Sequence, residues 1–388
     1  MKSNKRSSVV VVSAIIVIGI VVGGIGLFIL QLPHADDGTM NDTTLTSSTM
    51  RGPNPYEVAI VLPVGRLGDE GYIDAIYEGA TRAHNDYNIN FTYVETESIS
   101  DYAYFHRKFA AHEAFIEPYD LIIGMGLDQS NAILTVADEY PRQNWAIIDL
   151  PGIAIDPLMF PKIATANIKI NEGAALVGAI AGLMTETGSV GFLGDIDTYY
   201  TNLYAAGFVW AANYTYSKFT NPGSSILHDE RYTNNSMDMT LGMALTSEMY
   251  SAGADIIFSA SGRAGLGAFD AAKEANVSSS YPLWVIGCDV PQMRFGCTFP
   301  ETPAPPTLGL TSMVKRLDVI VYDLMYAAVL GLWQGGPKDY GIAENALNYE
   351  IRTELLTLPS DVLSIVEMIK TGIVNGTFTI PFEKRWMF

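Results

Sequence analysis

The feature that most constrains the fold is a regular alternation of apolar, strand-like segments with helix-like segments, which runs twice along the chain. In the first half, the apolar run 56–64 precedes a helical pattern at 73–87, and the same order recurs until WAIIDLPG at 145–152. The second half repeats this order from SVGFLGDID at 189–197 to LWVIGCDVP at 283–291. Short apolar runs bounded by glycine suit parallel strands that crossover helices cover on both faces. The pattern therefore predicts two similar α/β lobes, each built on a doubly wound parallel sheet.

Length and charge narrow the possible functions. A chain of 388 residues exceeds what one hydrophobic core usually serves, so two domains are expected. The formal net charge is −19, and such a surface repels phosphate backbones. Nucleic acid is therefore not an expected partner.

The N-terminus predicts a membrane anchor. A basic flank, MKSNKRSS, precedes an apolar run at residues 9–30, which is longer than the core of a cleaved signal peptide and long enough to span a bilayer. The basic flank favours an orientation with the body of the protein outside the cell. The alternative is a cleaved signal peptide. Residues 31–54 form a polar tether without periodicity, which predicts disorder.

Six N-x-Ser/Thr sequons suit an exported glycoprotein, although chance can also produce them in a chain rich in Ser and Thr. They start at Asn41, Asn90, Asn213, Asn234, Asn276 and Asn375.

Acidic and aromatic residues gather where the predicted strands end. In open α/β sheets, ligands bind beyond the carboxyl ends of the strands. The residues at these ends are Asp69, Asp128, Asp149, Asp195, Asp197 and Asp289, with Tyr72, Tyr199, Tyr200 and Tyr204 close by in sequence. Carboxylates bind vicinal hydroxyls and aromatic faces stack on rings, so the set suits a polyhydroxy ligand with a flat ring. The alternative is that each Asp only caps the helix that follows it.

Other chemistries find little support. The loop LPVGRLGDEGY at 62–72 matches neither the P-loop nor the dinucleotide fingerprint, and the five histidines show no metal-binding spacing. No metal and no cofactor are therefore expected. Ser312-Met-Val-Lys315 and Lys370-Thr-Gly372 match two of the three motifs of penicillin-binding enzymes, but the middle motif is absent between them.

The two cysteines, Cys288 and Cys297, flank the segment CDVPQMRFGC. A disulfide between them would stiffen the loop around Asp289, and we predict that bond; two buried thiols are the alternative.

From about residue 56 to 347 the chain resembles the basic membrane protein family, the substrate-binding components of ABC importers that include purine nucleoside receptors. The motifs that carry the resemblance are LTSMVKRLDVIVYD at 310–323, GADIIFSASGRAGLGAFDAAKEA at 253–275 and NEGAALVGAIAGLMTETGSVGFLG at 171–194. The resemblance implies the type I periplasmic-binding-protein fold, in which a hinge joins two lobes. We predict an anchor at 1–30, a tether at 31–54, an N-terminal lobe at 55–165 plus 288–325, and a C-terminal lobe at 166–287 plus 326–388.

The resemblance also implies a ligand site. Tyr72 and Tyr204 fall where the family has two phenylalanines that sandwich the base. The sugar would be held by Asp289 and Lys315, beside the glycine loop at Gly262, with Asp69 and Asp149 assisting. This chain departs from the family at Ile73, where the family has an Asn that helps to read the base, and at Arg263 and Ala264 in the glycine loop. Arg263 could instead recognise an acidic group on the ligand.

These expectations describe an anchored, extracellular solute-binding protein, monomeric and without catalysis, that delivers a nucleoside to an ABC permease. A surface sensor that signals to a partner protein is the alternative, as is a binder of another small ligand such as a flavin or a sugar. A serine-dependent acyl enzyme is a third hypothesis, on the motif at Ser312.

Overall fold

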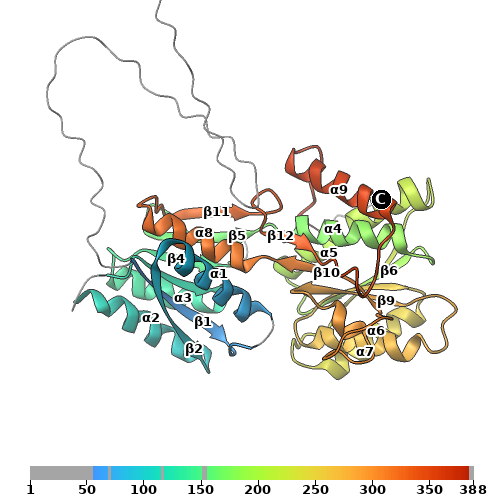
Figure 1. The fold of residues 1–388 in the computed structure, drawn as a ribbon, viewed down its shortest axis with the longest axis horizontal. Coiled ribbons are helices and arrows are strands. Elements are labelled where there is room, and N and C mark those ends of the chain that lie inside the picture. Colours follow the sequence, from blue (N-terminus) through green and yellow to red (C-terminus); the bar gives the residue numbers. More distant parts are fainter. Residues whose placement is uncertain (1–55, 69–70, 115–117, 151–154, 384–388) are drawn as a thin grey trace, which may run out of the picture. The chain divides into compact units, whose positions relative to one another are not determined.

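The computed structural model describes residues 56–68, 71–114, 118–150 and 155–383. These residues lie in one compact unit and form two six-stranded sheets, each of which makes a lobe with its helices (Figure 1). In the first sheet, the order is β11 (Gly336–Tyr340), β5 (Ile163–Ile168), β4 (Trp145–Ile148), β3 (Leu121–Met125), β1 (Tyr56–Val64) and β2 (Ile89–Thr96). In the second, the order is β12 (Leu347–Tyr349), β10 (Gly309–Lys315), β9 (Trp284–Asp289), β8 (Ile256–Ala260), β6 (Ser189–Gly194) and β7 (Leu227–Tyr232).

The two sheets have equivalent topologies, so each strand of one lobe has a counterpart in the other. The strand pairs of the first sheet are all parallel, and the second sheet differs only at its edge, where β12 runs antiparallel to β10. Strand β4 therefore corresponds to β9, and β5 corresponds to β10. The predicted fold of two doubly wound α/β lobes is confirmed.

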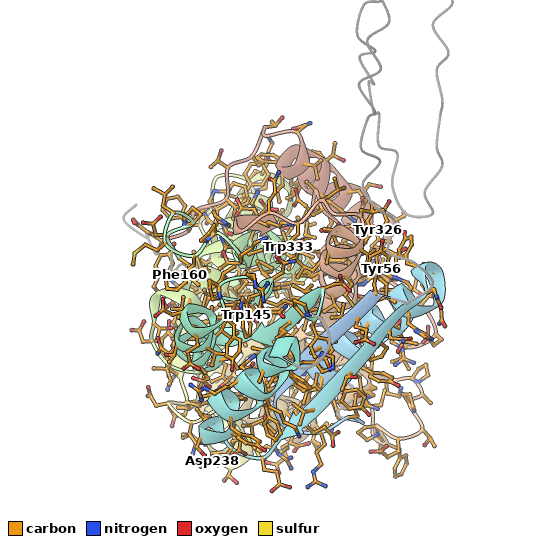
Figure 2. The ribbon with its side chains drawn as sticks, turned by 90° about the vertical axis from the view of Figure 1, so that its left-hand side faces the viewer. Tyr56, Trp145, Phe160, Asp238, Tyr326 and Trp333 are labelled. Carbon is orange, nitrogen blue, oxygen red and sulfur yellow. The ribbon has the colours of Figure 1, made fainter. Side chains whose placement is uncertain are left out.

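Alternate side chains of the strands enter different hydrophobic clusters, as expected for a sheet that is covered on both faces. In the first lobe, Val58 and Ile60 of β1 join one cluster, whereas Ala59 between them joins another. Helices α1 (Tyr72–Tyr87) and α8 (Leu317–Val329) cover the sheet face that carries Val58 and Ile60. Helices α2 (Tyr102–Ala110) and α3 (Gly126–Glu139) cover the opposite face, which carries Ala59. Figure 2 looks onto this lobe, with Trp145 of β4 labelled within it.

The second lobe repeats the arrangement. One face of its sheet is covered by α4 (Ile170–Met184), α5 (Tyr199–Thr215) and α9 (Ser360–Val374), and the other by α6 (Met239–Ser251) and α7 (Gly267–Ala275). Helices α4 and α5 cross very closely: a Cβ atom at Gly178 would lie 2.2 Å from the carbonyl oxygen of Phe208, and one at Gly207 would lie 2.1 Å from that of Asn171. The small residues of 171–182 thus let the two backbones pack together.

The chain passes between the lobes at three places in the described part: from β5 to α4, from β10 to α8, and from β11 to β12. The observed lobe boundaries after residue 287 differ from the predicted ones. Residues 288–325 were expected in the first lobe, but β9 and β10 belong to the second sheet, where Val314 pairs with Asp289. The return to the first lobe comes only with α8. Residues 326–388 were expected in the second lobe, but β11 joins the first sheet beside β5.

The predicted anchor at 1–30 and tether at 31–54 lie outside the described residues. Within the residues that are described, no helix has the length and apolar character needed to cross a membrane.

Candidate ligand-binding site

Two aspartates occupy equivalent positions in the two lobes. Asp149 directly follows β4, and Asp289 is the last residue of β9, the corresponding strand. Both have a left-handed backbone, with φ angles of 59° and 68°. Such a backbone is uncommon outside glycine but is better tolerated by Asp than by most residues. Each lobe therefore ends its equivalent strand with a carboxylate held in a defined turn.

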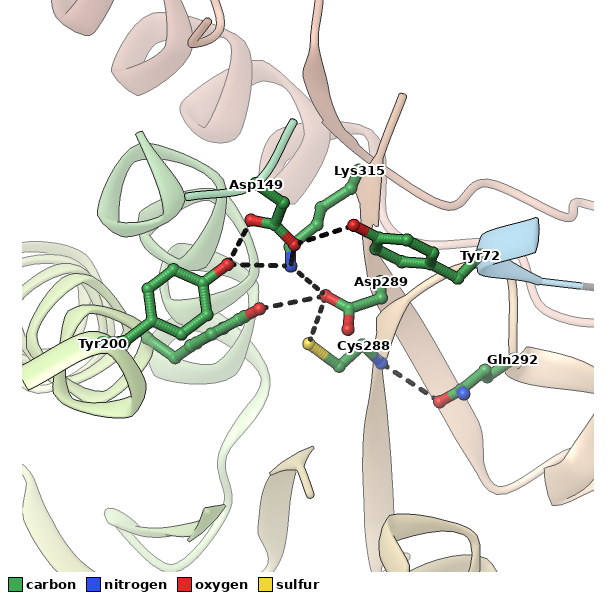
Figure 3. Close-up of polar contacts among 8 residues, drawn as sticks. Tyr72, Asp149, Tyr200, Cys288, Asp289, Gln292 and Lys315 are labelled. Atoms are coloured by element: carbon green, nitrogen blue, oxygen red, sulfur yellow. Dashed lines mark hydrogen bonds and ion pairs between the residues drawn. The ribbon is translucent and has the colours of Figure 1, made fainter. Parts of the chain in front are cut away.

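Lys315 connects these two carboxylates. It ends β10, and its Nζ lies 3.1 Å from Oδ2 of Asp149 and 3.3 Å from Oδ1 of Asp289 (Figure 3). The lysine side chain is only 3% exposed. Burial by itself would lower the pKa of Lys315, but the two carboxylates raise it well above its usual value. The ammonium group is therefore charged at neutral pH, and it partly balances two negative charges.

Three tyrosine hydroxyls complete the cluster. Tyr72 of α1 donates to Oδ2 of Asp149 at 3.3 Å, Tyr200 of α5 donates to Oδ1 of Asp149, and Tyr204 of α5 donates to Oδ1 of Asp289 at 3.1 Å. Burial, and after it the nearby carboxylates, raise the pKa of each tyrosine well above its usual value. All three hydroxyls therefore keep their protons and act as donors at physiological pH.

A pocket adjoins the cluster. Its volume is about 360 Å³, and it lies between the start of α1 and the ends of β9 and β10. Asp289 and Lys315 line it, together with Gly71, Asp74 and Arg316. The side chain of Asp289 is 35% exposed, which makes it the most accessible of the three charged groups. This place, at the carboxyl ends of the strands, is where open α/β sheets bind ligands.

A larger cavity of about 600 Å³ does not lie at the carboxyl ends of the strands. It is lined by residues such as Glu57 and Asn90, which lie at the amino ends of β1 and β2. Nor does any group of three or more His, Cys, Asp or Glu side chains within the described ranges have an arrangement that could hold a metal ion.

Five of the predicted site residues lie together in the cluster. They are Tyr72, Asp149, Tyr204, Asp289 and Lys315. Asp69 lies outside the described residues.

Gly262 and Arg263 follow β8 and are exposed, and the polar contacts of the cluster do not include them. Ile73 is buried in the core of the first lobe and is not among the residues that line the pocket.

The sequence did not assign two residues that the structure adds to the cluster. Tyr200 was one of several nearby tyrosines, and its signal was its spacing: it precedes Tyr204 by four residues and so shares its helix face. The thiol of Cys288 lies 3.3 Å from Oδ1 of Asp289 and donates to it. A thiol contact of this kind has no signature in the sequence.

The predicted disulfide is wrong in this structure, because Cys288 and Cys297 are both free and buried. Cys288 belongs to the core cluster that contains β9, whereas Cys297 packs in a separate cluster with Met293 and Leu355. The intervening turn directs the two side chains into different cores.

The serine of the penicillin-type motif does not contact the lysine of that motif in the hydrogen bonds described. Ser312 is fully buried, donates to Oε2 of Glu350 at 2.7 Å and accepts the backbone N–H of Gln292 at 2.9 Å. Its hydroxyl thus holds a structural carboxylate in the second lobe, and this geometry does not favour the acyl-enzyme hypothesis.

Comparisons with known proteins agree with this architecture. A family model described as ABC transporter substrate-binding protein PnrA-like, named Bmp, matches residues 56–380. The CD4+ T-cell-stimulating antigen of Listeria innocua is 31% identical over 385 residues, which cover 97% of this chain and 99% of that protein. The ABC transporter nucleoside-binding protein BmpA of Lactococcus lactis is 25% identical and covers 88% of this chain and 93% of its own.

Solved structures show the same fold. A solute-binding protein of an ABC transporter system from Aeropyrum pernix superposes with a TM-score of 0.67 at 22% identity, covering 85% of this chain and 95% of that one. The resemblance noted in the sequence is confirmed, as is the two-lobed fold.

Proposed function

Because the chain belongs to the Bmp family of PnrA-like ABC transporter substrate-binding proteins, we propose that it captures a purine nucleoside between its lobes for an ABC permease. Family membership establishes the class, a substrate-binding protein of an ABC transporter. The nucleoside is the finer proposal, and the name of the Lactococcus relative supports it.

One observation carries this proposal: Asp149 and Asp289, one from each lobe, converge on the buried Lys315. Carboxylates accept two hydrogen bonds from vicinal hydroxyls, and charge-assisted bonds of this kind are the stronger ones. Two carboxylates against one ammonium leave the cluster with a net negative charge, which disfavours a phosphate. A ribose without phosphate therefore fits the chemistry better than a nucleotide does.

The ring of the ligand would lie against Tyr72, which is partly exposed at the start of α1. Asp289 and Lys315 would hold the ribose, and Asp149 and Asp69 would assist. Ile73 stands where the family has an Asn that helps to read the base, and its side chain is buried in the core of the first lobe. No polar group at this position is therefore available to the base, so discrimination among purine bases should be weak.

The proposal also places the protein on the outside of the cell, as a monomer anchored by residues 9–30. The support is the length of this apolar run and the basic flank before it. The permease would then lie in the same membrane.

A thermal-shift screen of the intact chain, in mild detergent, tests the ligand. The panel contains adenosine, guanosine, inosine, the free bases, ribose and riboflavin. A ligand at 100 times its Kd adds about 2.7 kcal/mol of stability, which gives a clear rise in Tm. We expect this rise with the purine nucleosides.

Asp289→Asn should abolish most of the rise, because the amide loses the charge and half of the acceptor capacity. Asp270→Asn is the matched control, since Asp270 pairs with Lys273 on the surface of α7. If Tm rises only with riboflavin or only with ribose, the ligand is a flavin or a sugar and not a nucleoside. If both variants lose the rise in Tm equally, Asp289 is not a specific ligand contact.

A further inference from the structure

A short turn borders the pocket of the candidate site. Asp289, which ends β9, and the two residues after it, Val290 and Pro291, all line that pocket. The backbone of Asp289 is left-handed, with a φ angle of 68°. Such a conformation costs free energy outside glycine and persists only where neighbouring contacts hold it. The position of the Asp289 carboxylate therefore depends on what holds this turn.

The turn closes on itself at its base. The backbone N–H of Val290 donates to the carbonyl oxygen of Cys288 at 2.8 Å. The side-chain oxygen of Gln292 accepts the backbone N–H of Cys288 at 3.1 Å (Figure 3). These bonds fix the shape of the turn. Its first end is placed by β9, where Asp289 pairs with Val314 of β10, and its second end needs a further anchor.

Glu350 provides that anchor. Its Oε2 accepts the backbone N–H groups of Gln292 at 2.9 Å and of Met293 at 3.0 Å. The same oxygen accepts the hydroxyl of Ser312 at 2.7 Å, and the Ser312 hydroxyl in turn accepts the N–H of Gln292. The carboxylate therefore holds the second end of the turn both directly and through Ser312.

Glu350 is itself held firmly in the second lobe. It directly follows β12, its backbone N–H donates to the carbonyl oxygen of Ser312 at 2.8 Å, and its carbonyl oxygen accepts the hydroxyl of Thr311 at 2.8 Å. Glu350 is only 7% exposed and is not among the residues that line the pocket. It can therefore act on a ligand in this pocket only through the turn.

From these contacts we propose that Glu350 is a positioning residue of the site: its carboxylate holds the turn that presents Asp289 to the ligand. The ligand half of this inference rests on the proposed function. A binding group has to stand within about 0.5 Å of its productive position, and hydrogen bonds from the residues behind it supply that order. Loss of the Glu350 carboxylate should therefore weaken binding although Asp289 itself is unchanged.

Asp255 provides a matched control. It is 1% exposed, belongs to the same lobe and likewise accepts one hydroxyl and two consecutive backbone N–H groups, from Thr185, Glu186 and Thr187. It directly precedes β8, at the amino end of the strand, whereas the pocket lies at the carboxyl ends of β9 and β10. Glu350→Ala and Asp255→Ala therefore remove equivalent bonds, but only the first frees the turn. If an alanine variant does not fold, Glu350→Gln and Asp255→Asn are the pair for the same measurements, with the same directions expected.

The first measurement needs no ligand. Cys288 is buried at the base of the turn, so the rate at which a thiol reagent labels it reports how often the turn opens. Peptide mass spectrometry separates this label from any label at Cys297. We expect labelling of Cys288 to be roughly tenfold faster in Glu350→Ala than in the unsubstituted protein or in Asp255→Ala. Equal rates in the two variants overturn the anchoring of the turn by Glu350.

The second measurement is the Kd for adenosine. Glu350→Ala should bind about tenfold more weakly than the unsubstituted protein, and Asp255→Ala should bind equally well. Glu350→Gln should recover part of the loss, because its amide keeps an oxygen within reach of the two N–H groups. An unchanged Kd in Glu350→Ala would overturn the positioning role. If no protein binds adenosine but labelling of Cys288 accelerates as expected, the nucleoside proposal fails while the hold of Glu350 on the turn stands.

Discussion

Replacing Lys315 by Met should destabilise the protein more than any other single change in the cluster. The substitution keeps most of the side-chain volume and removes one charge, which lies 3.1 Å and 3.3 Å from two carboxylates. At an effective dielectric constant of about 20, a unit charge pair at such a distance attracts by roughly 5 kcal/mol, and the cost of burying the ammonium offsets part of this. Removing one partner of a buried ion pair costs about 3–5 kcal/mol, and we expect a loss of free energy of unfolding in this range.

Urea denaturation at pH 7, followed by circular dichroism, measures the loss. The pKa of Lys315 is raised in the folded protein, so its stabilisation is complete below about pH 10.5, the ordinary lysine value, and declines as the pH rises through the folded value. At pH 7 the full effect should therefore be seen.

Two further proteins make this test specific. Lys370→Met is the control, because Lys370 lies 3.9 Å from Glu367 with 27% of its side chain exposed, and such pairs are worth about 1 kcal/mol or less. Lys315→Met combined with Asp149→Asn should recover part of the loss, since one unpaired charge is gone. A loss below about 1 kcal/mol in Lys315→Met would refute the view that its charge balances the two carboxylates.

Three other predictions concern residues outside the cluster. Gly178→Ala should cost about 3 kcal/mol of unfolding free energy, because its Cβ would meet the carbonyl oxygen of Phe208; a value near zero would contradict the close helix crossing. Burial lowers the pKa of His106 to about 4, so stability should fall by up to about 3 kcal/mol between pH 6.5 and pH 4; His106→Gln should flatten this part of the urea-denaturation profile. In a glycosylating host, glycopeptide mass spectrometry should find a glycan at Asn375, which is exposed just after α9, and none at Asn213, which is partly buried within α5; the opposite result would count against the packing of α5.

The fold was largely predictable because its elements are local. The strands β3 and β4 are short, apolar and fully buried, and each follows or precedes a helix of ordinary length, so the periodicity identified them. The lobe boundaries were not predictable in this way. Strands β5 and β10 each precede a helix, and only their pairing partners decide which lobe each one belongs to.

The residues of the candidate site likewise fall into those that local sequence identifies and those that it does not. Asp149 and Asp289 were identified because each follows an apolar run, and Lys315 was identified through the family motif that contains it. The burial of Ile73 and Tyr204 was not predicted, nor was the bond of Tyr200 to Asp149 of the other lobe, since each depends on neighbours that are distant in the chain. The separation of Cys288 from Cys297 likewise depends on which core each side chain enters.

By itself, then, the sequence determined the class of fold, the acidic character of the protein and the strand ends that carry the site, because hydrophobic periodicity and net charge are properties of the chain alone. Tertiary structure decided which carboxylate joins the lobes, which tyrosines bond to it and how one lysine is shared. The physical reason is that hydrogen bonds and ion pairs act over about 3 Å, and only the packing of the two lobes brings residues as distant as Tyr72, Asp149, Tyr200 and Lys315 within that range.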